Sequence, residues 1–353
     1  MIKLKDTSRI QNLAASLIVI ALIIYALSVL KDILVPLIFA GILSFFLLPI
    51  CEFLEKRKFP RVLAIILAIL LAALILSTFI YFSYTQIIQL ESLIPVMIEK
   101  GTILLTHIEE IGHKTFKLNK FELLQKGQQY LTEILKNAPV LLGNTLGTTS
   151  NFLLNFSILP LYIFLFLLYR DFLKAFVFKV FKNGNKHKIS VVLEKINDVV
   201  RNYLVGLLLV IIIIGALNTI SLLALGIEHA IFLGFFAGIL VLIPYIGIAI
   251  GATIPIFVAL ITKDSYWYPL GVAIAFAAIQ FLEGNFITPY IVGSKVSINS
   301  LAAIIVLLLF SSLWGVAGLV LALPLTAILK VIFDSNEDLK AWGFLLGDSD
   351  KLD

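Results

Sequence analysis

Three polar side chains, Gln280, Glu283 and Asn285, interrupt an otherwise apolar stretch of the chain. Gln280 and Glu283 are three residues apart and would share one face of a helix, whereas Asn285 follows Gly284, where a helix can unwind. A carboxylate at or within a bilayer is energetically costly, and it usually marks a path for ions or protons. We therefore interpret the three residues as a candidate binding site. It could hydrogen-bond a polyhydroxylated solute, or hold a cation together with backbone carbonyl groups.

Glu283 also has a purely structural interpretation, as a capping or snorkelling carboxylate at the end of its helix. Asn218 lies inside another apolar stretch, where its amide either belongs to the same site or holds two helices together by a hydrogen bond. Arg201 opens that stretch, and we expect it to anchor the helix at the membrane interface, with an ion pair to Glu283 as the alternative. The residues alone leave these alternatives open.

The composition explains why these polar groups stand out. Hydrophobic residues make up 60% of the 353 residues and charged residues only 14%, with a mean hydropathy of +1.06, whereas soluble domains carry about 25% charged residues. The chain is therefore predicted to be an all-α polytopic membrane protein whose first partner is the lipid bilayer. Its net charge of +5 is attributed to basic cytoplasmic loops and not to nucleic-acid binding. The single cysteine, Cys51, excludes an internal disulfide.

About eight hydrophobic blocks follow one another along the chain, and each is read as a helical segment. The blocks are 12–30, 33–50, 62–84, 151–169, 203–226, 230–262, 266–282 and 300–332. We divide the chain into five parts on this basis. They are three scaffold helices (1–85), an extracytoplasmic insert (86–148), a fourth helix with a basic segment (149–199), a transport core (200–333) and a cytoplasmic tail (334–353).

Lysine and arginine gather at the amino terminus, at residues 56–61 and at residues 170–201. Because cytoplasmic loops collect these residues, all three regions and both chain termini are expected on the cytoplasmic side. The interval 86–148 is then outside, and its helical apolar spacing predicts a small helical domain. Its two histidines, His107 and His113, lack a third partner, so no metal site is expected.

Two blocks, 230–262 and 300–332, have lengths that fit neither one crossing nor two. As one straight helix either would be about 50 Å long, whereas the hydrocarbon core is about 30 Å thick. Both contain residues that can break a helix, and we interpret both as broken or re-entrant hairpins, with kinked single spans as the alternative. The expected tips and hinges are Pro244, Tyr245, Gly247, Pro289, Gly293, Trp314, Gly315, Gly318 and Pro324. With hairpins, 203–262 and 266–332 form an inverted repeat, an architecture typical of secondary transporters.

The order and spacing of these residues resemble the autoinducer-2 exporter (AI-2E) family of bacterial transporters. The matching motifs are Pro244-Tyr245-x-Gly247, Gln280-x-x-Glu283-x-Asn285-x-x-x-Pro289, Gly293, Trp314-Gly315-x-x-Gly318 and Pro324, with Arg201-x-Tyr203 and Leu225-Gly226 before them. The resemblance implies a multi-pass protein of the bacterial cytoplasmic (inner) membrane that assembles as a homo-oligomer, with a pentamer as one form. It also implies export of a small furanosyl signalling molecule, or exchange of sodium or lithium for protons.

Enzyme classes are disfavoured because the sequence has no His-Glu-x-x-His zinc motif, no Gly-x-Ser-x-Gly nucleophile elbow and no P-loop. No cofactor is expected. The sequence therefore predicts an ATP-independent secondary transporter that exports a small polar solute such as an autoinducer-2 type molecule. A sodium (lithium)/proton antiporter is the first alternative, and a membrane scaffold or regulator that uses residues 86–148 is the second.

Overall fold

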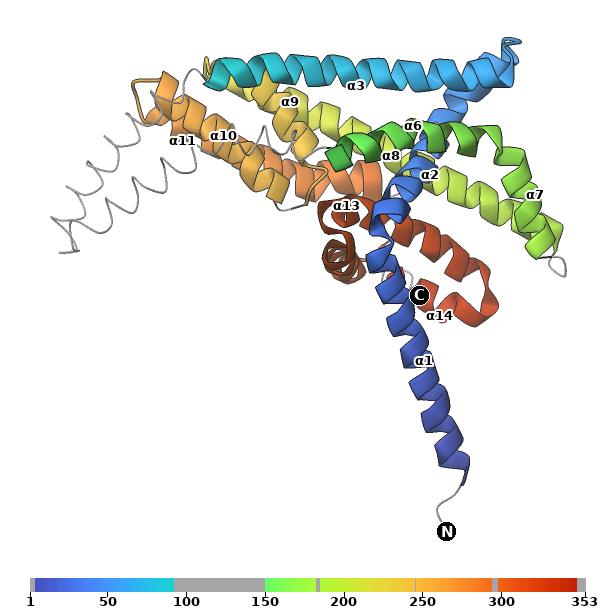
Figure 1. Ribbon diagram of the computed structural model, residues 1–353. Coiled ribbons are helices and arrows are strands. Elements are labelled where there is room, and N and C mark those ends of the chain that lie inside the picture. The colour runs from blue at the N-terminus through green and yellow to red at the C-terminus, as the bar shows by residue number, and fades with distance from the viewer. Residues whose placement is uncertain (1–3, 92–149, 182–184, 245, 294–297, 348–353) are drawn as a thin grey trace. The chain divides into compact units, whose positions relative to one another are not determined.

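The computed structural model describes residues 4–91, 150–181, 185–244, 246–293 and 298–347. Every regular element in this part of the chain is helical (Figure 1). The predicted all-α class is thus confirmed. The predicted insert lies outside the described residues except for 86–91, which continue a helix that begins at Arg61. Tyr245 also lies outside them.

The described residues form eleven α-helices, two short π-helices (η1, η2) and one 3-10 helix (η3). In chain order they are α1 (Leu4–Val29), α2 (Lys31–Lys56), α3 (Arg61–Glu91), α6 (Ser150–Leu168), α7 (Arg170–Val180), α8 (Lys186–Ala224), α9 (Ala230–Leu240), α10 (Ile246–Thr262), α11 (Trp267–Leu282), η1 (Glu283–Ile287), η2 (Pro289–Gly293), α13 (Ser300–Ser335), η3 (Glu337–Leu339) and α14 (Lys340–Leu346).

Five helical segments of the described chain are long and apolar enough to cross a bilayer: 31–56, 61–86, 186–224, 267–293 and 300–335. Shorter apolar helices at 14–29, 158–168, 230–240 and 247–262 add to them. Many large apolar side chains on these helices are exposed. Such surfaces suit contact with lipid, since lipid tails are as apolar as the side chains themselves. The chain is therefore a multi-pass membrane protein.

The chain divides into two compact units whose segments alternate along the sequence. One unit contains residues 1–69, 155–205 and 292–353, and the other contains 70–154 and 206–291. The second unit has its own core, in which α8 contributes Leu222, α9 Leu233, α10 Val258 and α11 Phe276. Within it α10 packs against both α9 and α11.

The block 230–262 is two helices. Helix α9 ends at Leu240, and α10 begins at Ile246 after a turn that contains Pro244. A Cβ on Gly247 would lie 1.7 Å from the carbonyl oxygen of Leu240, so only glycine lets the two helices approach this closely. Two further glycines, Gly234 and Gly238, bring α9 against α8 at Thr219 and Gly215 in the same way.

The block 300–332 lies within α13, which is broken at Gly315. Gly315 has φ 61° and ψ −138°, a conformation available to glycine and unfavourable for other residues. A Cβ on Gly318 would lie 1.8 Å from the carbonyl oxygen of Phe310. Eight residues of a straight helix span about 12 Å, so the two arms of α13 must fold back at this point.

Trp314 fixes the break in α13 to α1. Its indole Nε1 donates a hydrogen bond of 3.0 Å to the carbonyl oxygen of Leu27, one of the last carbonyl groups of α1, which have no partner within the helix. The ring packs in a cluster with Ile42 of α2, Val200 of α8 and Leu321 of α13.

The other expected hinges lie in helices. Pro289 begins η2 and Gly293 ends it, whereas Pro324 is buried inside the second arm of α13. Among the described positions, the sharp breaks therefore lie at Gly315 and in the turn that contains Pro244.

Replacing Gly318 by alanine should lower the melting temperature of the purified protein, because the new methyl group would overlap the Phe310 carbonyl and overpacking of this kind costs about 1–3 kcal/mol. Gly41→Ala is the matched control, since its Cβ would meet only the Phe166 ring at 3.9 Å. Thermal unfolding followed by intrinsic fluorescence measures both. Equal melting temperatures for the two variants would contradict the folded-back arms.

Candidate functional site

Glu283 is buried where α11 ends and η1 begins, with 8% of the residue exposed. Gln280 Nε2 donates a hydrogen bond of 2.7 Å to one carboxylate oxygen, Oε2. The hydroxyl of Thr288 donates to the other, Oε1. Both oxygens thus have a donor, which reduces the free energy required to keep a carboxylate among apolar helices.

Thr288 reaches Glu283 because the helix is widened here. In η1 the backbone N–H of Thr288 donates to the carbonyl of Glu283, five residues earlier, which is the hydrogen-bond pattern of a π-helix. In an α-helix a residue five positions ahead would point about 140° away. The sequence indicated only that the helix could unwind after Gly284, and Thr288 was missed for that reason. Short π-helical turns of this kind are frequent at functional sites.

Asn285 does not join Glu283 in this arrangement. Its side chain is exposed, and its Nδ2 donates a hydrogen bond of 2.8 Å to the carbonyl oxygen of Phe281. The structure therefore brings together Gln280, Glu283 and Thr288, and leaves Asn285 bonded to its own helix.

A cavity of about 210 Å³ lies between α8, α9, α10 and α11 in the same unit. Its walls are mostly apolar, with Val241, Ile248 and Phe276 among them. Asn218 from α8 and Gln280 from α11 are its polar residues. The sequence placed both in the candidate site, and the structure places both on one cavity although they are distant in the chain.

Asn218 is the unusual member of this cavity. Only 3% of the residue is exposed, and its side-chain oxygen has no hydrogen-bond partner among the described residues. A buried amide oxygen without a donor is unfavourable by about 1–3 kcal/mol, so such a group needs an explanation beyond packing. A donor group on a bound molecule would satisfy it.

Hydrogen-bonding groups extend from the cavity to the buried carboxylate of Glu283. Asn218 offers an acceptor on the cavity, Gln280 lines the cavity and donates to Glu283, and Thr288 donates to the same carboxylate. The volume corresponds to several water molecules, at about 30 Å³ each, or to one small organic solute. Apolar walls with a few placed polar groups are typical of small-molecule sites.

The described residues hold no group of three His, Cys, Asp or Glu side chains that could bind a metal ion. Arg201 lies on α8 and is exposed.

Known proteins resemble this chain over most of its length. The family model described as "AI-2E family transporter" matches residues 15–337. "Putative transport protein YrrI" of Bacillus subtilis strain 168 is 27% identical over 316 residues, which cover 86% of each chain. A Haemophilus influenzae protein described as "Putative transport protein" is 27% identical, with 96% of this chain and 97% of that one covered.

"AI-2 transport protein TqsA" of Escherichia coli K12 is 24% identical over 320 residues, and 91% of each chain is covered. The family model and these relatives are described as transporters or transport proteins, and the apolar helices of this chain agree with a place in the membrane. The chain belongs to the AI-2E family of transporters.

Proposed function

We propose that this protein is an ATP-independent secondary transporter that exports a small polar solute such as an autoinducer-2 type signalling molecule. The observation that supports this most is the cavity on which the unpartnered Asn218 oxygen and the Gln280 amide lie. A small furanosyl molecule carries hydroxyl groups that could donate to Asn218. The name of the Escherichia coli relative, an AI-2 transport protein, agrees with this substrate class.

Two broken segments would supply the movement. We propose that α9 with α10, and the two arms of α13, are re-entrant hairpins that enter the bilayer from opposite sides as halves of an inverted repeat. The turn that contains Pro244 and the break at Gly315 would then be the hairpin tips. Substrate would pass when one half moves against the other.

A sodium or lithium/proton antiporter is the second candidate, and the environment of Glu283 supports it. A buried carboxyl group with a hydroxyl donor and an amide donor can exchange these partners for a proton or a monovalent cation. Intramembrane carboxyl groups have such roles in many pumps and transporters.

The distribution of lysine and arginine supports a position in the bacterial cytoplasmic membrane with both termini inside the cell. We also propose that the protein assembles as a homo-oligomer, such as the pentamer implied by the family resemblance. Residues of the first three helices would then form the scaffold and part of the subunit interface.

Glu283→Gln should abolish transport without loss of folded protein, because the amide cannot release or accept a proton as the carboxyl group does. Asn285→Ala is the matched control and should retain transport, since Asn285 donates only to the Phe281 carbonyl. The measurement uses proteoliposomes with a trapped pH dye, to which sodium, lithium or the furanosyl signal is added. Full activity of Glu283→Gln would exclude this role for Glu283.

The two transport functions give different results in this assay. A cation-dependent proton flux that is lost in Glu283→Gln indicates the antiporter. Movement of the organic solute without that flux indicates the exporter. No flux of either kind from folded protein would favour the scaffold function.

Thr288→Val should lower the transport rate about tenfold or more, because a hydrogen bond to a charged group contributes roughly 1.5–3 kcal/mol. Thr288→Ser keeps the hydroxyl donor and should retain the transport rate in the same assay.

Asn218→Leu should abolish solute transport while the melting temperature stays the same or rises. Leucine is similar in size to asparagine, so the packing around position 218 is retained while the unpartnered oxygen is removed. Asn202→Leu, an exposed position of the same helix, is the control and should transport normally. A large fall in melting temperature for Asn218→Leu would instead show that Asn218 holds helices together.

The hairpins can be tested by cysteine labelling in a Cys51→Ser background. Pro244→Cys and Val316→Cys should react with a small polar thiol reagent from opposite sides of the membrane, and Lys188→Cys provides the cytoplasmic reference. We choose position 316 for the label and not position 315, because the positive φ of Gly315 is unfavourable for cysteine. Failure of both positions to react from either side would favour kinked single spans.

A further inference from the structure

Helix α7 is amphipathic, and its apolar side is uncovered. Phe172, Leu173, Phe176 and Val180 lie on one side at helical spacing and are 68%, 38%, 56% and 57% exposed. This element is only 11 residues long, too short to cross a bilayer. A short helix with a large apolar side and a basic polar side is typical of a segment that lies in the membrane surface.

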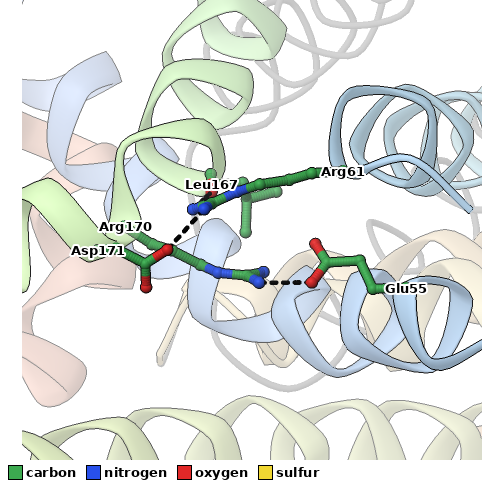
Figure 2. Close-up of polar contacts among 5 residues, drawn as sticks. All are labelled: Glu55, Arg61, Leu167, Arg170 and Asp171. Carbon is green, nitrogen blue, oxygen red and sulfur yellow. Dashed lines mark hydrogen bonds and ion pairs between the residues drawn. The ribbon is translucent and has the colours of Figure 1, made fainter. Parts of the chain in front are cut away.

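Ion pairs place the start of α7 at the polar boundary of three apolar helices (Figure 2). Arg170 forms an ion pair of 2.5 Å with Glu55 at the end of α2. Arg61 at the start of α3 forms one of 2.6 Å with Asp171 and donates to the Leu167 carbonyl at the end of α6 at 2.9 Å. Charged groups from α2, α3 and α7 therefore meet at one level, where the apolar segments end.

The positive partner of the Arg170–Glu55 ion pair stays charged over a wide pH range. Burial lowers the pKa of the Arg170 guanidinium, but the hydrogen bond and charge of Glu55 outweigh it and raise the pKa above its usual value. Since arginine is charged at all ordinary pH values, the position of α7 at this boundary does not depend on protonation of Arg170.

An apolar groove of about 400 Å³ continues from this side of α7. Six residues of α2, α6 and α7, among them Leu37, Phe166 and Phe172, line it together with Tyr169 between α6 and α7, and none of the seven is charged. Of the two lysines of α7, Lys179 adjoins Phe172 at one edge of the apolar side, and Lys174 lies on the polar side of the helix. An apolar groove and two cations on the same helix match the chemistry of a lipid with an acyl chain and a negative headgroup.

We propose that α7 lies in the membrane surface and binds an anionic phospholipid there. One acyl chain occupies the groove of α2, α6 and α7, the headgroup phosphate contacts Lys179, and Lys174 adds positive charge that attracts the anionic headgroup. This site is separate from the cavity at Asn218 and does not depend on the transported substrate.

The depth of α7 can be measured with nitroxide labels in a Cys51→Ser background in vesicles of phosphatidylcholine and phosphatidylglycerol. A label on Phe176→Cys should be relaxed by oxygen and shielded from a water-soluble nickel chelate. Ala175→Cys, an exposed position outside the apolar side of the same helix, should be reached by the chelate. Equal chelate access at both positions would overturn the membrane location and indicate a site for a soluble partner.

The lipid class is tested by a fluorophore on Phe176→Cys and quenching by nitroxide-labelled phosphatidylglycerol or phosphatidylcholine. The apparent affinity should favour phosphatidylglycerol. Lys174→Gln with Lys179→Gln should reduce that preference by up to roughly 30-fold, because each lysine near an anionic surface contributes about 1 kcal/mol. Lys186→Gln with Lys188→Gln changes the net charge equally at exposed positions of α8 and should leave the preference unchanged.

Three results would overturn the phospholipid site. One is equal quenching by both lipids in the parent protein, and another is an unchanged preference in the Lys174/Lys179 variant. The third is an equal loss in the Lys186/Lys188 variant, which would show that general positive charge and not α7 attracts the lipid.

Discussion

Polar groups among apolar helices must find partners within the protein, because lipid offers no hydrogen bonds. The carbonyl of Leu27 at the end of α1 receives the indole hydrogen of Trp314, and both oxygens of Glu283 receive side-chain donors. Trp314 thereby ties the break in α13 to α1, and the paired Glu283 can remain buried at the end of α11. The irregular parts of the helices are stable because they satisfy this requirement.

Asn218 is among the buried side chains that do not meet this requirement, and it lies on the cavity. Glycines at 215, 234, 238 and 251 let α8, α9 and α10 approach closely, so most of this unit is tightly packed. The cavity remains where α9 ends and the chain turns, with an amide oxygen facing no donor of the described chain. Unpaired buried groups destabilise a protein, and a substrate that donates to this oxygen, as we propose, would remove that cost.

Membership of the AI-2E family and the geometry around Glu283 address different questions. The family establishes a membrane transport protein and leaves the substrate open. The geometry gives a cavity of about 210 Å³ and a buried carboxylate with two donors, on which our two proposals for the substrate rest. The exposed apolar side of α7 supports a separate proposal, that this helix lies in the membrane surface.

The sequence by itself determined the membrane class, the number and approximate extent of most apolar helices, and the breaks near Pro244 and Gly315. The length of an apolar helix and its breaks at glycine or proline depend on residues that are close together in the sequence, so both can be predicted from the sequence. Only the tertiary structure decided that Thr288, and not Asn285, reaches Glu283, and that Asn218 and Gln280 share a cavity. The first depends on a π-helical register that side-chain spacing does not reveal, and the second on the packing of four helices distant in sequence.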